Sequence, residues 1–375
     1  MQIDPDKVYL YQARIDRDEA PFAQYRSLAY AALNALELEL PSSGTVLVKP
    51  NATVLFPPEK RVITHPGFVG GVLDALIDQG VPRERLLVAE GQSGEQPQNG
   101  HTWEVSGYQE MLAQRRLPLR VLNGVETRPV PVPGGVVYDS YPIAREVMEC
   151  SYFLNLPLAK CHNLGCTTLS IKNLMGILTS PVRHLCNIQE VDQPFAEGIW
   201  RLTESGLSLF EDRFLHKLCD LVAALRSLKM PRLSVVDGLV GRDGTAFNEG
   251  RNYPLGWAVL GRNEVHVDAV VTYLMGLDPV VTPYLKFAAA RGLGTNRVEE
   301  IEVVDLLSGQ ALDPDALRAR RSPKVLMPVS RYSKGYYRRF RSDGSVVPWR
   351  IDEVNQQRQA DGQPLVPVTV DGDYQ

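Results

Sequence analysis

The chain has 375 residues, of which 44% are hydrophobic and 22% are charged, so disorder over its whole length is excluded. It carries 40 Lys and Arg against 44 Asp and Glu, and the resulting net charge of −4 gives no reason to expect a polyanion-binding protein. No apolar run is long enough to span a membrane, and the first residues do not resemble a secretory signal. We therefore expect a cytoplasmic protein with no membrane partner.

The cysteines are odd in number and spread through the chain, which does not fit a disulfide framework. They are Cys150, Cys161, Cys166, Cys186 and Cys219. We expect reduced thiols. Because the chain has no Cys-x-x-Cys and no run of three closely spaced cysteines, we expect no iron–sulfur cluster.

Apolar runs of strand length alternate with stretches of helical periodicity, which predicts an α/β protein with a largely parallel central sheet flanked by helices. The first clear strand is Thr45–Val48. A helix should start at Pro66 and end before Gly80, and Leu86–Ala89 should return to the sheet, so that these segments form a βαβ unit. Later we expect helices at 108–116, 268–275 and 283–290, and strands at 119–122, 152–156, 233–236, 257–260 and 300–304.

Two regions depart from this alternation. Residues 194–229 read as long helices, with Phe210, Phe214 and Leu218 at helical spacing, and we interpret about 181–230 as a helical insertion in an α/β domain of residues 1–312. Residues 313–375 are Pro-rich, basic and aromatic. We expect this C-terminal extension to pack on the core, or on a partner subunit of a homo-oligomer.

Several predicted strands end in a polar cluster. These clusters are Lys49-Pro50-Asn51, Glu90-Gly91, Lys160-Cys161-His162 a little beyond its strand, and Asp237-Gly238. The carboxyl ends of parallel strands share one edge of a sheet, where ligands bind, so we expect the clusters to converge. Turn chemistry alone explains any single cluster equally well.

Residues 156–178, LPLAKCHNLGCTTLSIKNLMGIL, contain Lys-x-His followed by Lys-Asn-x-x-Gly. This pattern resembles the core signature of the uncharacterised family known as domain of unknown function 362. Further pieces that agree in order lie at 48–51, 64–66, 89–91, 235–241, 261–270 and 275–279. The resemblance spans about residues 44–294 and implies an α/β fold, but no settled activity. Many members of the family look like fusions to a ferredoxin-type iron–sulfur module, which this chain lacks.

The lysines of these motifs indicate an anionic ligand. Lys172 lies among apolar residues, where loss of water would lower its pKa and make it a base, or where it could stay charged and hold an anion. A surface lysine with a buried stem is the simpler alternative. Lys49 and Lys160 could add two positive charges, and a carboxylate or a phosphate would fit them. Asn51 and Asn173 would donate neutral hydrogen bonds to the substrate, or satisfy only local backbone.

Three of the six histidines, His65, His162 and His184, can reach the same edge, and Arg183 beside His184 could help to hold an anion. Without a metal, His162 is the best general acid or base, because the unperturbed pKa of histidine lies near neutrality. We interpret His101, His216 and His266 as structural or exposed.

The acidic residues and histidines of the motifs neither establish nor exclude a metal site. His162 and His184 with Glu90 or Asp268 could bind a divalent metal, although no compact spacing fixes one. Asp237 could orient a lysine or histidine at the substrate, and Asp268 could do the same or cap a helix. The chain has neither a GxGxxG nor a GxxxxGK[ST] motif, so we expect neither NAD nor ATP.

These patterns favour an enzyme of small-molecule metabolism that acts on a carboxylated or phosphorylated substrate. Lys49, Lys160 and Lys172 would hold charge and His162 would move protons, in an isomerase, epimerase, lyase or hydrolase reaction. One alternative is a redox or metal-handling protein, as the fused relatives suggest. Another is a nucleic-acid-binding module that uses residues 331–341, where cations and aromatic residues alternate. We expect this segment instead to pack its aromatic residues inward with its arginines in solvent, which disfavours nucleic acid.

Overall fold

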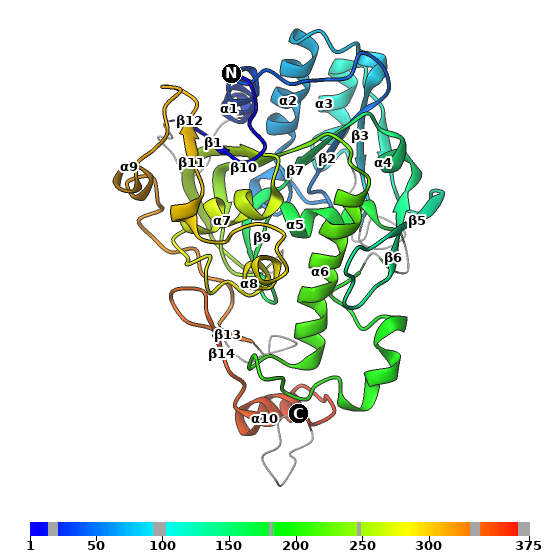
Figure 1. The fold of residues 1–375 in the computed structure, drawn as a ribbon, viewed down its shortest axis with the longest axis vertical. Coiled ribbons are helices and arrows are strands. Elements are labelled where there is room, and N and C mark those ends of the chain that lie inside the picture. Colours follow the sequence, from blue (N-terminus) through cyan, green and yellow to red (C-terminus); the bar gives the residue numbers. More distant parts are fainter. Residues whose placement is uncertain are drawn as a thin grey trace.

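A computed structural model describes residues 1–13, 22–92, 103–179, 182, 184–245, 249–330 and 338–366. Its centre is a ten-stranded sheet with helices on both faces (Figure 1). The strands of this sheet are β1 (Val8–Gln12), β2 (Val46–Pro50), β3 (Leu86–Glu90), β4 (Leu119–Val121), β7 (Tyr152–Leu156), β8 (Leu158–His162), β9 (Cys166–Thr168), β10 (Arg232–Arg242), β11 (Asn252–Gly261) and β12 (Val303–Asp305). The architecture confirms the predicted α/β fold.

α-Helices and two small two-stranded sheets lie outside the central sheet. The helices are α1 (Phe22–Asn34), α2 (Pro66–Asp78), α3 (Tyr108–Arg115), α4 (Arg145–Glu149), α5 (Ser170–Asn173), α6 (Leu209–Ser227), α7 (Glu264–Leu274), α8 (Pro283–Ala290), α9 (Pro314–Arg318) and α10 (Ile351–Ala360). The two-stranded sheets pair β5 (Thr127–Pro131) with β6 (Ser140–Ala144), and β13 (Arg339–Phe340) with β14 (Val346–Val347). None of the helices in this part of the chain combines the length and the apolar character that a membrane span needs.

The strand order is β12-β1-β11-β10-β7-β2-β3-β4, with β8 beside β10 and β9 beside β8. From β10 to β4 neighbouring strands are parallel, whereas β11 runs antiparallel to both of its neighbours. The chain moves from β2 outward to β3 and β4, and then returns to place β7 on the other side of β2. The direction of winding therefore reverses between β2 and β7, and this reversal leaves a crevice at their carboxyl ends.

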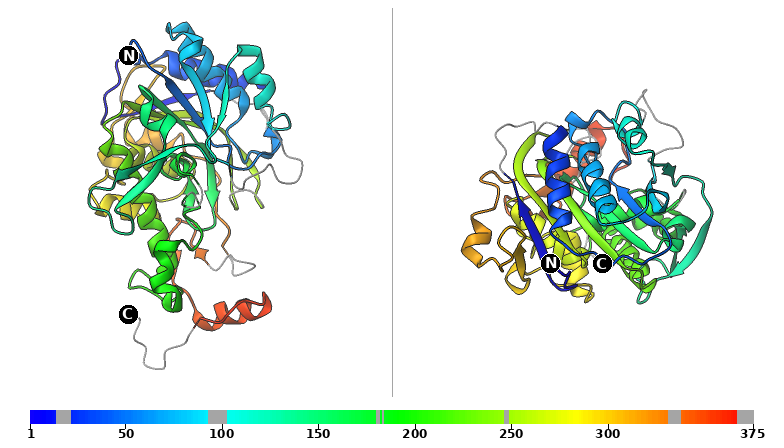
Figure 2. Two further views of the ribbon diagram at one scale, coloured as in Figure 1. Left: turned by 90° about the vertical axis from the view of Figure 1, so that its right-hand side faces the viewer. Right: turned by 90° about the horizontal axis from the view of Figure 1, so that it is seen from above.

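Strand residues alternate between two apolar cores. Val46 and Val48 of β2 pack in the core beneath α1, α2 and α3, while Leu47 packs in the core shared with α6, α7 and α8. Figure 1 shows the two helical layers on opposite faces of the sheet, and Figure 2 shows α1 and α2 lying over it from above. Burial of both faces explains why these strands read as continuous apolar runs in the sequence.

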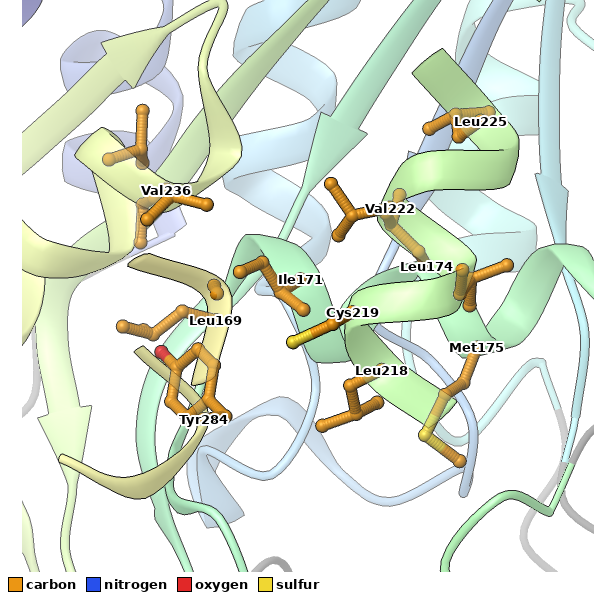
Figure 3. Packing of buried hydrophobic residues seen from close by; sticks show 14 of the residues in the cluster. Leu169, Ile171, Leu174, Met175, Leu218, Cys219, Val222, Leu225, Val236 and Tyr284 are labelled. Atoms are coloured by element: carbon orange, nitrogen blue, oxygen red, sulfur yellow. The ribbon is translucent and has the colours of Figure 1, made fainter. Parts of the chain in front are cut away.

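Helix α6 links the sheet to the far end of the molecule. Its side chains Leu218, Cys219 and Val222 pack on Ile171 and Leu174 around α5 (Figure 3). The helix begins with a capping box between Ser208 and Glu211, and this end extends beyond the sheet toward α10 (Figures 1 and 2). The region interpreted as a helical insertion thus contributes a helix to the main core.

Several predicted elements match closely, among them α2, β7 and α8, but three boundaries near the motifs were wrong. Strand β10 does not end at Asp237-Gly238: it continues to Arg242 with a bulge after Gly238, where an added Cβ would overlap the ring of Trp257. Helix α7 begins four residues before Asp268 and is capped by Asn263, so Asp268 is not its cap. Lys160 and His162 lie within β8 and not beyond a strand.

The C-terminal extension returns to the core. Most of the alternating basic and aromatic segment, residues 331–337, lies outside the described residues. Of the rest, Phe340 packs on Cys166 and Leu277, as expected for an inward-facing aromatic residue. Arg338 differs from the expectation that the arginines lie in solvent: its side chain is buried, and Nε donates to Glu211 Oε1 at 2.9 Å.

Candidate functional site

The carboxyl ends of β2, β3, β7 and β8 border a cavity of about 120 Å³, several times the 10–15 Å³ or so that one water needs. It lies where the winding of the sheet reverses. Lys49 stands opposite Asn155 in the parallel register of β2 and β7, so the last residues of both strands reach this edge together. Most of the residues that the motifs singled out line the cavity: Lys49, Asn51, Glu90, Lys160, His162, Lys172, Asn173 and His184.

Lys49 and Glu90 form a buried ion pair on one side of the cavity, with Nζ 3.0 Å from Oε1. The lysine has three acceptor groups, because it also donates to Pro50 O at 3.1 Å and to Asn173 Oδ1 at 3.2 Å. The carboxylate accepts backbone N–H groups of Ala52 and Gly91, both at 2.8 Å. Burial lowers the pKa of Lys49 and raises the pKa of Glu90, and the contact between them opposes both shifts. The charges of Lys49 and Glu90 therefore neutralise each other on this side of the cavity.

The glycine of the Lys-Asn-x-x-Gly motif makes room for this ion pair. A Cβ on Gly176 would overlap Oε1 of Glu90 and lie 2.7 Å from Cε of Lys49. The carbonyl of Gly176 also accepts the N–H of Gly91 at 3.0 Å. The spacing of the motif therefore has a packing reason, since it places the one residue without a side chain against the pair.

Lys160 occupies the other side of the cavity and has different partners. Its Nζ donates to Asn51 Oδ1 at 2.9 Å and to the carbonyl of Val62 at 2.6 Å, and both acceptors are uncharged. The residue is 3% exposed. Burial, reinforced by the positive charges of Lys172 and Arg242, lowers the pKa of Lys160 from 10.5 to about 7. Protonated and neutral forms of this amine therefore coexist near neutrality.

Amide side chains join the two halves. Asn51 Nδ2 donates to Asn173 Oδ1 at 3.1 Å, and Asn173 Nδ2 donates to Asn155 Oδ1 at 2.8 Å. The sequence reasoning missed Asn155. An asparagine within the otherwise apolar strand Tyr152–Leu156 was the available signal, because a buried amide needs partners.

Lys172 projects from α5 into the cavity and is only partly buried. Within the described residues no carboxylate pairs with it, and its Nζ lies 6.0 Å from the centre of the Phe214 ring. Burial lowers its pKa. Asp268 holds α5 in place from behind: it accepts the N–H groups of Ser170 at 2.7 Å and Ile171 at 3.0 Å. Asp268 therefore does not reach the cavity, and burial raises its pKa to about 7.

His162 is held as a neutral donor. Its Nδ1 accepts the backbone N–H groups of Leu164 at 3.0 Å and Gly165 at 3.1 Å, so its ring proton belongs on Nε2. Burial and the nearby charges of Lys172 and Lys160 lower its pKa well below 6.5. This differs from the expectation that His162 titrates near neutrality. At pH 7 it offers an N–H donor and has no free basic nitrogen.

Two predicted site residues lie elsewhere. His65 is the N-cap of α2, where Nδ1 accepts the N–H of Gly67 at 3.0 Å, and its ring stacks on Tyr25. Its pKa falls to about 2 through burial and the charge of Arg61. Asp237 pairs with Arg61 Nη2 at 3.0 Å and accepts the N–H of His65 at 3.0 Å. Both residues connect α2 to the sheet. Arg183 lies outside the described residues.

The candidate metal ligands do not form a metal-binding cluster within the described part of the chain. Among the residues whose positions are described, no three His, Cys, Asp or Glu side chains come close enough to hold a metal ion. His162, His184 and Glu90 share the cavity, but Nδ1 of His162 and both oxygens of Glu90 already accept backbone hydrogen bonds. Asp268 lies behind α5.

Comparison with known proteins identifies a family and a relative. The model of a family described as Domain of unknown function (DUF362) matches residues 46–273. This range includes β2, β3, β7, β8 and α5, which together surround the cavity. A similar protein is Thylakoid-associated protein sll1697 of Synechocystis sp., which is 24% identical over 292 residues, covering 76% of this chain and 78% of that protein.

Proposed function

The chain belongs to the DUF362 family, and from the contents of its cavity we propose that it is an enzyme of small-molecule metabolism that acts on an anionic substrate by proton transfer. One observation carries this proposal: Lys160 and Lys172 line the same cavity, and among the described residues neither has a carboxylate partner. Two ammonium groups in a poorly hydrated space repel each other, and an anion between them would relieve that repulsion. A carboxylate or a phosphate meets this need.

Three of the polar side chains that line this space would take different roles. Lys172 holds the anionic group of the substrate. Lys160, with its pKa of about 7, accepts or returns a proton at neutral pH. His162, neutral and protonated on Nε2, donates a hydrogen bond to an oxygen on which negative charge develops. This arrangement suits removal of a proton from a carbon next to a carbonyl or carboxyl group, as in isomerases, epimerases and lyases.

The alternative functions have less support. Among the described residues no three candidate ligands come close enough to hold a metal ion, and what is described of the basic and aromatic segment includes a buried Arg338 and a buried Phe340. The proposal keeps the cytoplasm as the site of action. Association with thylakoids is a description of the Synechocystis protein alone.

Calorimetric titration with phosphate and with short-chain carboxylates tests the anion-binding part. We expect Lys172→Met to weaken binding at least tenfold. Lys60→Met is the matched control, because Lys60 is an exposed lysine whose Nζ lies 4.2 Å from the centre of the Phe56 ring. The control should bind as the unmodified protein does. Unchanged binding by a folded Lys172→Met protein would contradict the proposal.

Isotope exchange tests the proton-transfer part. In D₂O the protein should catalyse exchange of the hydrogens next to the carbonyl or carboxyl group of a carboxylate that binds. Lys160→Met should lose this exchange, and Lys60→Met should retain it. Exchange that persists in Lys160→Met would assign the proton transfer to another residue.

A further inference from the structure

Lys49 and Lys160 differ in how many hydrogens their partners can accept. A protonated lysine has three N–H donors, whereas a neutral amine has two donors and one lone pair. Lys49 has three acceptor groups, Pro50 O, Glu90 and Asn173 Oδ1, so its surroundings match an ammonium ion. Lys160 has two acceptors within the described residues, Asn51 Oδ1 and Val62 O. Its surroundings match a neutral amine whose lone pair has no hydrogen-bond donor among the described residues.

The remaining position on the Lys160 nitrogen is available to a ligand. Lys160 is 3% exposed and lines the cavity, and two hydrogen bonds hold its nitrogen to the side chain of Asn51 and to the carbonyl of Val62. Lys172 lines the same cavity, and its positive charge opposes protonation of Lys160. A buried lysine beside a second cation is a recognised way of making an amine nucleophilic at neutral pH.

We propose that Lys160 is a covalent nucleophile and that the substrate is a small oxo acid, whose carbonyl carbon Lys160 attacks while Lys172 holds its carboxylate. This inference rests on the proposed function, because it uses the same cavity and the same anion-binding lysine. A cavity of about 120 Å³ suits an acid of only a few carbon atoms.

The chemistry balances without an added oxidant or reductant. The lone pair of Lys160 Nζ forms the new C–N bond as the C=O π pair moves onto oxygen. Transfer of a proton from nitrogen to that oxygen gives a carbinolamine. The C–O bond then breaks, and with one further proton from solvent the oxygen leaves as water. The sum is amine plus carbonyl plus one proton, giving a protonated imine and water.

His162 and the imine account for catalysis after this step. The Nε2–H of His162 can donate a hydrogen bond to the carbonyl oxygen without giving up its proton, since Nδ1 is fixed as an acceptor. The protonated imine withdraws electrons from the adjacent carbon and makes its C–H bond more acidic, so that its proton passes to water. In this route Lys160 activates the C–H bond through the imine and no longer serves as the base. Addition of water releases the product and returns Lys160 to its starting state.

Reductive trapping tests the proposal on the full chain. The protein is incubated with pyruvate or acetoacetate and sodium cyanoborohydride, and the modified residue is located by peptide mass spectrometry. We expect one adduct on Lys160, absent from Lys160→Arg and unchanged in Lys60→Met. Lactate and 3-hydroxybutyrate serve as matched acids without the carbonyl, and these should bind without forming an adduct.

The pH dependence of trapping provides a measurement that does not rely on replacing Lys160. The midpoint for labelling should lie near the pKa of Lys160, about 7, and should move to higher pH in Lys172→Met, because a neighbouring positive charge has been removed. Labelling itself should also weaken with the loss of carboxylate binding. A structural role for Lys172 would not move this midpoint.

Two results would overturn the inference. If the oxo acids bind but label Lys160 no more than exposed lysines, or label Lys172 instead, Lys160 is not the nucleophile and the anion-binding function survives. If neither the oxo acids nor their hydroxy counterparts bind, the proposed function itself fails. Calorimetry on the same samples separates the two.

Discussion

The two sides of the cavity hold the same residue type in opposite roles. Lys49 and Lys160 both belong to strands that end at this edge of the sheet, and both side chains are buried. Lys49 has a carboxylate partner and three acceptor groups, and Lys160 has an amide and a carbonyl. Burial alone therefore does not indicate function. The charge of the partners indicates it, because only an uncompensated lysine gains from binding an anion.

The Lys49–Glu90 pair also positions the residues around Lys160. Lys49 contacts Asn173 on the segment that carries Lys172, and Asn173 in turn contacts Asn51, the partner of Lys160. The ion pair thus connects the ends of β2 and β3 to α5 and fixes the amide that orients Lys160. We interpret the Lys49–Glu90 pair as the frame of the site and the Lys160–Lys172 side as its reactive part.

Loss of the Lys49–Glu90 ion pair should have the largest effect on the free energy of unfolding. Glu90→Gln leaves a buried ammonium without its countercharge, and we expect it to lower the free energy of unfolding by about 3–5 kcal/mol. Urea denaturation measures this, with Glu59→Gln at an exposed position as the control. Adding Lys49→Met should recover part of the loss. A Glu90→Gln protein within about 1 kcal/mol of the original would show that the pair does not support the fold.

Lys160 should make stability depend on pH in the opposite sense to an ion-paired lysine. Its pKa is about 7 in the folded chain and 10.5 when solvated, so between these values the unfolded chain binds more protons. Stability contributed through Lys160 therefore rises with pH across this window, by up to about 1.4 kcal/mol per pH unit. The unfolding free energy of Lys160→Met, measured at pH 7, 8 and 9, should lack that rise relative to the original. Parallel curves for the two proteins would contradict the lowered pKa.

Filling the space at Gly176 should have a moderate effect. In Gly176→Ala the new methyl group meets the Lys49–Glu90 pair, and we expect a loss of about 1–3 kcal/mol in unfolding free energy. Gly198→Ala is the matched control, because the Cβ added there lies 3.5 Å from a flexible arginine, an ordinary contact. Equal stability of the two variants would mean that the pair moves aside without cost.

The structure shows which parts of the fold and of the site could be predicted from the sequence. Strand-length apolar runs located β2, β3 and β7, and the rule for parallel strands gathered Lys49, Glu90 and Lys160 at one cavity, while the Lys-Asn-x-x-Gly motif added Lys172. The same rule failed for Asp237, because β10 continues past it where Gly238 makes room for Trp257. Spacing along a chain does not reveal whether a strand ends or bulges at a polar pair.

The sequence also could not predict which charged side chains pair, for a related reason. Nothing in the motifs shows that Glu90 belongs to Lys49 and not to Lys160, since that choice depends on the register of β2 against β3 and on the contacts of α5. The state of His162 depends on two backbone N–H groups in the turn that follows it. The residue type predicted a general acid or base at this position. The main-chain hydrogen bonds instead make His162 a neutral hydrogen-bond donor.

Replacement of Lys172 should cause the smallest change in the free energy of unfolding. It therefore distinguishes the Lys160–Lys172 side of the cavity from the Lys49–Glu90 side. Lys172→Met removes a charge that, within the described residues, has no carboxylate partner, and replaces a partly buried stem with one of similar length. No ion pair with a described residue is lost and repulsion toward Lys160 is relieved, so unfolding free energy should change by no more than about 0.5 kcal/mol. Urea denaturation at pH 7 checks this beside Glu90→Gln. A loss of several kcal/mol would mean that Lys172 also belongs to the frame, because a lysine reserved for a ligand contributes little to the fold in its absence.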